Sequence, residues 1–196
     1  KTYNSFAQRE ALASMLAMPF GSSLLVSLPT GSGKSLLFQY PILVQKNWKN
    51  VTIVIVPTTS LALDQERRIK DELIKKKIVI DHRLAWSYAL NDKEKRIIKS
   101  KIINGSQGIL FVSPETVVNN LLPSLYKAVK ADLINYIVID EAHLISEWGD
   151  SFRIEYQTLA GIRNGLLNYA GNKPFKTLLL SATFSNECLN FISNFY

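Results

Sequence analysis

The stretch "SLLVSLPTGSGKSLLFQY", residues 23–40, decides the fold. It begins as a short apolar run typical of a buried strand, passes through a turn rich in glycine and hydroxyl residues, and continues with helix-like character. A strand that leads through such a turn into a helix is a building unit of α/β domains. The turn itself is either a binding loop or only a turn of small residues.

The residue types of the turn, residues 28–35, are those that a phosphate-binding loop requires. Glycines let the backbone approach a phosphate, a lysine reaches the outer phosphates and a hydroxyl holds magnesium. Leu28 departs from the general pattern, which has a leading glycine there. The strand before and the helix after nevertheless favour a nucleotide and magnesium site over a simple turn. The predicted binding residues are Thr30, Gly31, Ser32, Gly33, Lys34 and Ser35.

Strand-like and helix-like segments alternate along the whole chain. Apolar or β-branched runs occupy residues 23–28, 51–56, 108–112, 136–140 and 177–181, with a weaker sixth run at 84–89. Helical patterns follow Lys34 and span 59–75, 91–103, which opens with the capping signal "NDKE", and 115–130, which Pro123 interrupts. This alternation predicts a doubly wound, mostly parallel sheet with helices on both faces, whose ligands bind beyond the carboxyl ends of the strands.

Two acidic residues stand at the end of the fourth run, in "VIDEAH", residues 138–143. We expect Ser35 to be a magnesium ligand, Asp140 to order the water shell of that ion, and Glu141 to align and polarise the attacking water. Lys34, Asp140 and Glu141 are therefore the predicted catalytic residues. The competing interpretation of the two acids is an ordinary strand-ending turn before a helix.

Length and composition are those of an ordinary globular domain. The 196 residues are 47% hydrophobic and 20% charged, which excludes a disordered or fibrous chain. No apolar run approaches the roughly 20 residues of a membrane helix, and the single cysteine, Cys188, forms neither an internal disulfide nor a zinc site by itself. We therefore expect an intracellular protein, cytoplasmic if bacterial, without membrane contact or structural zinc.

The net charge of +7 arises largely from "RRIKDELIKKK" (67–77) and "KEKRIIKSK" (93–101). A basic balance makes binding of a polyanion plausible. The alternative is that both runs are the solvated faces of two helices.

Three motifs in order resemble a known family. "LPTGSGKS", "DEAH" (140–143) and "SAT" (181–183) resemble motifs I, II and III in the first RecA-like domain of superfamily 2 helicases. "VPTTSLALDQ" (56–65) and "FVSPETV" (111–117) resemble motifs Ia and Ib, and "LISEWGDSFRIEY" (144–156) resembles the aromatic-rich loop of RecQ-type DNA helicases. The resemblance implies that the parent protein is an ATP-dependent 3′ to 5′ DNA helicase that uses ATP and Mg²⁺ and binds single-stranded or forked DNA.

The N-terminal stretch "FAQRE" (6–10) resembles the glutamine motif that precedes the phosphate loop in this family. The amide of Gln8 can pair with the N6 and N7 edge of adenine, which would favour ATP over GTP. Tyr3 or Phe6 could stack on the base, and the sequence does not choose between them.

The resemblance also implies a set of residues that couple DNA contact to ATP hydrolysis. In the aromatic-rich loop these are Trp148, Phe152 and Arg153; the alternative is that the two aromatic side chains pack in the core. Glu147, Asp150 and Ile154 depart from the family pattern, as in RecQ-like proteins of bacterial DNA-modification and phage-defence systems, and the added carboxylates would repel DNA phosphates. Ser181 and Thr183 would relay the nucleotide state through His143; alternatively their hydroxyls cap the next helix.

We expect residues 1–196 to form one helicase ATP-binding domain, with the second RecA-like domain of the same parent chain absent. That second domain supplies the arginine finger in this family, so we expect this chain to bind nucleotide, hydrolyse it poorly and unwind nothing alone. Two rival functions stay open: an RNA-directed or non-unwinding superfamily 2 translocase, and a binding module whose nucleotide site is regulatory or inactive.

Overall fold

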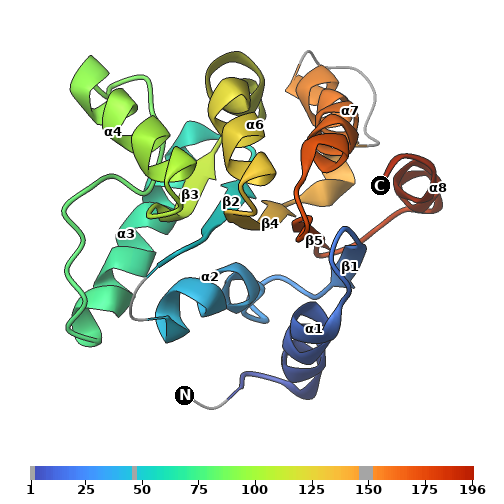
Figure 1. Ribbon diagram of the computed structural model, residues 1–196. Helices are drawn as coiled ribbons and strands as arrows, with labels where there is room; N and C mark the ends of the chain where they lie inside the picture. The colour runs from blue at the N-terminus through green and yellow to red at the C-terminus, as the bar shows by residue number, and fades with distance from the viewer. Residues whose placement is uncertain (1–2, 46–47, 146–151) are drawn as a thin grey trace.

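Five parallel strands form a single sheet at the centre of the molecule (Figure 1). A computed structural model describes residues 3–45, 48–145 and 152–196, without the side chains of residues 152–155 and 157. The strand order is β1-β5-β4-β2-β3, and every neighbouring pair is parallel. The strands are β1 (Ser23–Ser27), β2 (Val51–Ile55), β3 (Gly108–Val112), β4 (Ile134–Ile139) and β5 (Lys176–Ser181). The predicted doubly wound α/β fold and the five strong strand runs are therefore confirmed.

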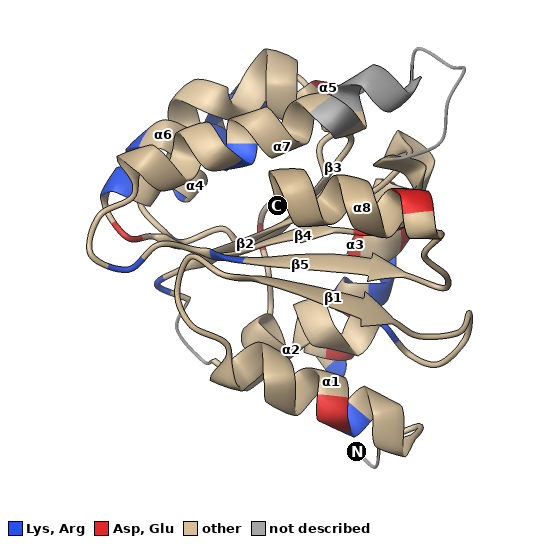
Figure 2. Cartoon of the chain, turned by 90° about the vertical axis from the view of Figure 1, so that its right-hand side faces the viewer, with Lys and Arg blue, Asp and Glu red and all other residues tan. Residues whose placement is uncertain are grey.

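Helices cover both faces of the sheet, as the edge-on view in Figure 2 shows. One face carries α1 (Phe6–Ala17), α2 (Ser35–Val44) and α3 (Thr59–Lys75). The other carries α4 (Asp92–Ile103), α5 (Pro114–Thr116), α6 (Leu122–Lys130), α7 (Phe152–Tyr169) and α8 (Asn186–Phe195), with a 3₁₀ turn at Ala142–Ile145. Because side chains alternate along each strand, Val54 and Val138 pack under α1–α3 while Ile53 and Ile137 pack under α4–α8.

Two of the elements predicted from the sequence need correction. The weak sixth run, 84–89, is not a strand: it makes one isolated bridge, between Ala85 and Phe111, beside the edge strand β3. The helix expected over 115–130 is instead α5, a π-helical segment at Val117–Leu121 and then α6. Pro123 lacks a backbone N–H, so it fits in the first turn of a new helix rather than inside a continuous one.

Local capping sets where the helices begin. Asn91 and Glu94 form a reciprocal capping box at α4, as the "NDKE" signal predicts. Thr58 caps α3 by accepting a hydrogen bond from the Leu61 N–H. Ser185 caps α8 by accepting one from the Cys188 N–H, so neither Ser181 nor Thr183 is the cap of that helix.

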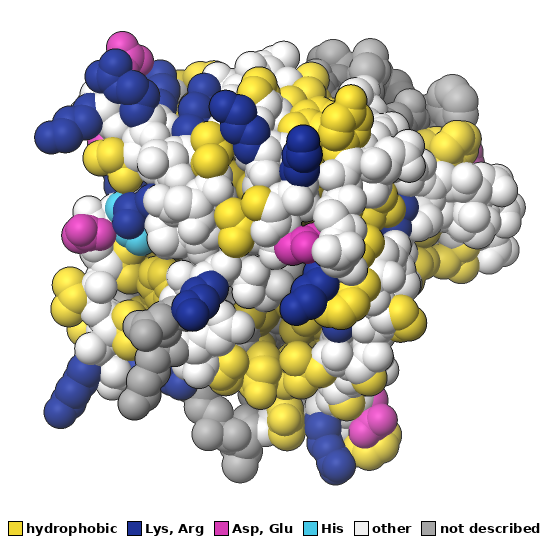
Figure 3. Space-filling view, in the orientation of Figure 1, with side chains coloured by type: hydrophobic (Ala, Val, Ile, Leu, Met, Phe, Trp, Pro, Cys, Tyr) yellow, Lys and Arg dark blue, Asp and Glu magenta, His cyan; other side chains and the backbone are white. Residues whose placement is uncertain are grey.

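The two basic runs lie on α3 and α4, and their surroundings differ. On α3 the charges pair within the helix: Arg67 and Arg68 with Asp64, and Lys70 with Glu66. On α4, basic side chains gather on the surface, at the upper left of Figure 3. Binding of a polyanion by either run stays a prediction.

Strand order explains how distant motifs meet. The segments that follow β1, β5, β4, β2 and β3 lie in that order along the carboxyl edge of the sheet. They contain the glycine-rich loop, "SAT", "DEAH", "VPTTSLALDQ" and "FVSPETV" respectively. The registers that pair Ser27 with Ser181 and Ile55 with Ile139 bring the ends of these strands level. The fold thus places all five motifs at the edge where parallel sheets bind ligands.

Candidate functional site

The glycine-rich loop leaves β1 and curls back before α2 begins. Gly31 and Gly33 have φ angles of +80° and +84°, which side chains disfavour. The Lys34 ammonium donates a hydrogen bond to the Leu28 carbonyl at 2.8 Å, so the lysine bridges the two ends of the loop. Leu28 itself is buried, and its N–H donates to the Ser181 carbonyl at 3.0 Å, which continues the pairing of β1 with β5. This strand-like position accounts for a large apolar residue where the general pattern has glycine.

The loop and the acidic pair face a common cavity of about 460 Å³. Most of the predicted phosphate and catalytic residues line it: Thr30, Gly31, Gly33, Lys34, Ser35, Asp140 and Glu141. Ser32 does not; its hydroxyl donates to the Pro29 carbonyl at 2.6 Å and stabilises the turn. Two segments more than 100 residues apart in sequence are therefore brought together, as the predicted site requires.

The acidic pair is held in a tight turn after β4. Asp140 extends the strand by donating its N–H to the Ile55 carbonyl, and its carboxylate accepts a hydrogen bond from the Glu141 N–H at 3.1 Å. Glu141 has a φ angle of +51°, an uncommon conformation for a residue with a side chain and one that often occurs at functional sites. Burial, and after it the charge of Glu141, raise the pKa of the Asp140 carboxyl to about 6.

Magnesium fits the donors in this cavity. A hydroxyl oxygen from Ser35 and carboxylate oxygens from Asp140 are the hard ligands that Mg²⁺ prefers, and the ion would offset the repulsion between Asp140 and Glu141. Two protein ligands leave the remaining positions to water and phosphate, which is the usual pattern for this ion.

A second cavity, of about 490 Å³, lies beside the first and shares Gly33 and Ser35 with it. Gln8 and Tyr3 line this second cavity, whereas Phe6 does not and is 73% exposed. The Gln8 amide nitrogen donates to the Gly33 carbonyl at 2.9 Å, and its oxygen accepts from the Asn4 N–H at 2.8 Å. An amide has a second hydrogen and a second lone pair for adenine, so the base contact stays a prediction.

A short chain of hydrogen bonds connects the acidic turn with the end of β5. The His143 Nδ1 atom lies 2.9 Å from the Ser181 hydroxyl and 3.4 Å from the Glu141 carboxylate. The Ser181 hydroxyl donates to the Thr183 carbonyl at 2.6 Å and accepts from the Thr183 N–H at 3.2 Å. His143, Ser181 and Thr183 are thus in contact, as a relay between them requires.

The remaining coupling residues belong to the segment between the 3₁₀ turn and α7 or to the first turn of α7. Trp148 lies outside the described residues, and so do the side chains of Phe152 and Arg153 at the start of α7. Base stacking by the two aromatic residues stays a prediction.

Sequence reasoning missed one wall of the phosphate cavity. Leu61, Gln65 and Arg68, all on α3, line it together with the loop and the acids. These residues are spaced i, i+4 and i+7, so they share one face of a helix. The spacing in the sequence indicates that the three side chains lie on one face of the helix. It does not indicate that this face lies against the phosphate cavity.

A family model for the DEAD/DEAH box helicases matches residues 5–191. The chain belongs to this family. It is also similar to the ATP-dependent DNA helicase RecQ of Haemophilus influenzae, at 37% identity over 94% of this chain and 27% of the relative. With the probable ATP-dependent DNA helicase RecS of Bacillus subtilis it shares 31% identity over 95% of this chain and 33% of that one. The chain thus spans about a quarter to a third of the length of these curated relatives.

Solved helicase structures share the fold. The helicase MrfA, in a crystal with DNA and AMPPNP, superposes with a TM-score of 0.72 at 20% identity, covering 96% of this chain and 26% of MrfA. The helicase domain of Hef from Pyrococcus furiosus gives a TM-score of 0.60 at 16% identity, over 95% of this chain and 35% of that one. This likeness identifies the RecA-like architecture. In the part of the chain that the structure describes, no helix is both long and apolar enough to cross a bilayer.

Proposed function

We propose that residues 1–196 form the first RecA-like, ATP-binding motor domain of a RecQ-like ATP-dependent DNA helicase. One observation carries the proposal: Lys34 and Ser35 line the same cavity as Asp140 and Glu141. The similarity to RecQ and RecS over most of the chain supports DNA as the polymer on which the parent protein acts.

The residues of the cavity divide the chemistry among them. Backbone N–H groups of the loop and the Lys34 ammonium would bind the β- and γ-phosphates. Ser35 and Asp140 would hold Mg²⁺, whose charge would offset that of the phosphates. Glu141 would orient the attacking water and accept its proton at a carboxylate oxygen. The neighbouring cavity with Gln8 and Tyr3 would take the adenine, since both cavities meet at Gly33 and Ser35.

The nucleotide state would reach the DNA side through His143. Its imidazole lies between the Glu141 carboxylate and the Ser181 hydroxyl, so a change at the γ-phosphate can alter the hydrogen bond to the segment after β5. Trp148, Phe152 and Arg153 are proposed to make the DNA contact, together with the second RecA-like domain of the parent chain.

The proposal is tested by steady-state ATP hydrolysis of the full-length parent protein. We expect stimulation by single-stranded DNA, weaker stimulation by RNA of the same length, and loss of turnover by about 10²-fold or more in Glu141→Gln. Stimulation by RNA alone would favour an RNA-directed enzyme. Unchanged turnover in Glu141→Gln would favour a regulatory or inactive nucleotide site.

A further inference from the structure

One face of α3 contributes polar groups to the phosphate cavity that the site described so far does not use. Gln65 and Arg68 line this cavity but not the neighbouring cavity with Gln8. A nucleotide with its base beside Gln8 would pass Gly33 and Ser35, which line both cavities, and end in the cavity of Asp140. The face of α3 therefore meets the phosphate end of the nucleotide and not the base.

The charge at this wall is positive. Arg67 and Arg68 share a single partner, Asp64, through its two carboxylate oxygens at 2.6 and 2.7 Å. Two guanidinium groups against one carboxylate leave one positive charge in excess. Of Asp64, Arg67 and Arg68, it is Arg68 that lines the cavity. A guanidinium has five N–H donors in a planar fork, so Arg68 keeps donors for a phosphate while it contacts Asp64.

Gln65 adds an acceptor at the same wall. Its side-chain oxygen is buried and has no hydrogen-bond partner among the described residues. A buried polar atom without a partner needs an explanation, and in a polar cavity ordered water is a common one. A phosphate has acceptor oxygens only, so this oxygen suits a water molecule next to the phosphate rather than the phosphate itself.

We propose that α3 forms a wall of the nucleotide site that distinguishes a triphosphate from a diphosphate. Arg68 binds the outermost phosphate through its guanidinium fork, and the Gln65 side-chain oxygen holds a water molecule beside that phosphate. This inference rests on the proposed function and deepens it, because it gives this chain a γ-phosphate contact of its own, separate from any arginine supplied by a second domain.

Arg68 is tested by equilibrium binding of fluorescent AMPPNP and ADP derivatives to the 196-residue chain in Mg²⁺. We expect Arg68→Ala to bind the triphosphate analogue about tenfold more weakly, with ADP affinity within about twofold, since one charge-assisted contact is lost. Arg67→Ala is the matched control, because Arg67 contacts the same Asp64 but does not line the cavity. It should leave both affinities within about twofold of wild type.

The outcomes separate this inference from the proposed function. Equal effects of Arg68→Ala on both nucleotides, or no effect on either, would overturn the α3 contact while nucleotide binding itself stands. Absence of binding by the wild-type chain would overturn the proposed function and this inference with it. Thermal melting of each variant checks that the fold is kept.

Gln65 is tested in the full-length parent protein with Gln65→Leu, which keeps the side-chain volume and removes the acceptor. We expect kcat for ATP hydrolysis to fall about tenfold with little change in KM, because a positioned water is lost rather than a phosphate contact. A rise in KM at constant kcat, or no change in either constant, would contradict this role.

Discussion

The imidazole Nδ1 of His143 and the hydroxyl of Ser181 lie 2.9 Å apart, which joins the acidic turn after β4 to the end of β5. The direction of this hydrogen bond is determined by its surroundings. A serine hydroxyl has one hydrogen, and Ser181 gives it to the Thr183 carbonyl at 2.6 Å, so His143 is the donor. The same nitrogen lies 3.4 Å from Glu141, and the proton on Nδ1 therefore faces both the acid and the hydroxyl.

Replacing Ser181 with alanine removes the acceptor of this contact. We expect Ser181→Ala in the parent protein to keep KM for ATP within about twofold while DNA-stimulated turnover falls about tenfold. The variant loses the hydrogen bond to His143 but keeps the phosphate-binding loop. Ser27→Ala is the matched control: Ser27 pairs with Ser181 in the register of β1 with β5, but its hydroxyl donates to Ala182. Equal losses in the two variants would argue against a specific link.

The two loop glycines have similar backbone strain but different surroundings. A Cβ atom on Gly33 would lie 2.3 Å from the Gln8 amide nitrogen, whereas one on Gly31 would have nothing within 4 Å. Alanine at either positive φ costs about 1 kcal/mol of backbone strain, so this cost is common to the two variants, whereas the contact with Gln8 belongs to Gly33 alone. We expect Gly33→Ala to bind ATP at least about tenfold more weakly than Gly31→Ala. Equal affinities, measured by titration, would show that Gln8 does not brace the loop.

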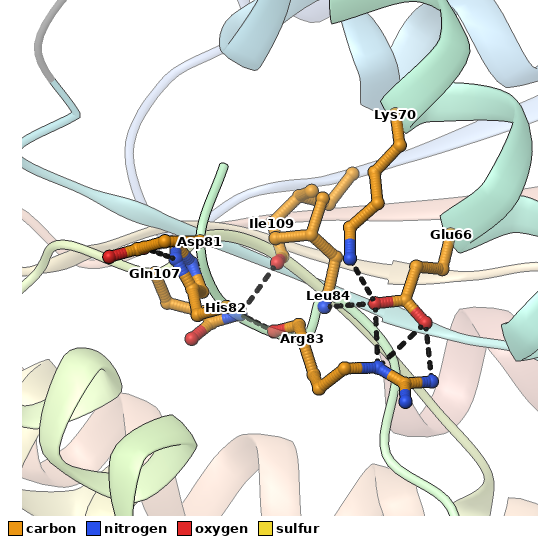
Figure 4. A network of polar contacts seen from close by, with 8 residues as sticks. All are labelled: Glu66, Lys70, Asp81, His82, Arg83, Leu84, Gln107 and Ile109. Atoms are coloured by element: carbon orange, nitrogen blue, oxygen red, sulfur yellow. Dashed lines mark hydrogen bonds and ion pairs between the residues drawn. The ribbon is translucent and has the colours of Figure 1, made fainter. Parts of the chain in front are cut away.

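An ion pair between the buried Glu66 and the partly exposed Arg83 fixes the segment that runs beside β3, and Figure 4 shows its contacts. The Glu66 carboxylate, on α3, accepts hydrogen bonds from the Arg83 guanidinium at 2.8 Å and from the Leu84 N–H at 2.7 Å, and pairs with Lys70 at 3.0 Å. Burial alone would raise the pKa of Glu66, but these hydrogen bonds outweigh it and lower the pKa below 4.5.

This pKa shift gives a signed prediction for acid stability. A carboxyl with a lower pKa in the folded state stabilises the fold above the unfolded pKa, near 4.5, and loses that contribution as pH falls through the folded pKa. At neutral pH, Glu66→Gln should lower the free energy of unfolding by about 1 to 2 kcal/mol, since Arg83 loses its charged partner but stays partly exposed to water. The difference in unfolding free energy between Glu66→Gln and wild type should shrink as the pH falls below about 4.5. Asp71→Asn, an exposed acid on the same helix, should change stability by under about 0.5 kcal/mol. A Glu66→Gln deficit in urea unfolding that stays constant down to acidic pH would contradict this account.

Hydrolysis by the 196-residue chain should be slow. If the arginine finger comes from a second domain, its absence costs about 10³- to 10⁵-fold in rate, so the chain should turn over far more slowly than the DNA-stimulated parent protein. Turnover at the parent's rate, measured by phosphate release, would show that no such contribution is needed.

The sequence predicted the sheet well because each buried parallel strand is a compact apolar run followed by a turn. It did not predict α1, α7 or α8. In α1 the buried positions include Gln8 with Leu12 and Met15, so the apolar stripe is incomplete. Lys34 and Asp140 could be predicted as partners because their motifs carry recognisable chemistry. Arg68 could not, because its position depends on how α3 packs against the loop, which no local pattern encodes.

The central claim is that Lys34 and Asp140 meet around one Mg²⁺-bound triphosphate. Calorimetric titration of AMPPNP into the purified 196-residue chain, with and without Mg²⁺, tests it most directly. We predict one site per chain, binding that depends on Mg²⁺, affinity at least about tenfold weaker in Lys34→Ala, and loss of the Mg²⁺ dependence in Asp140→Asn. Wild-type affinity in Lys34→Ala, or AMPPNP binding by the wild-type chain that does not depend on Mg²⁺, would contradict the account.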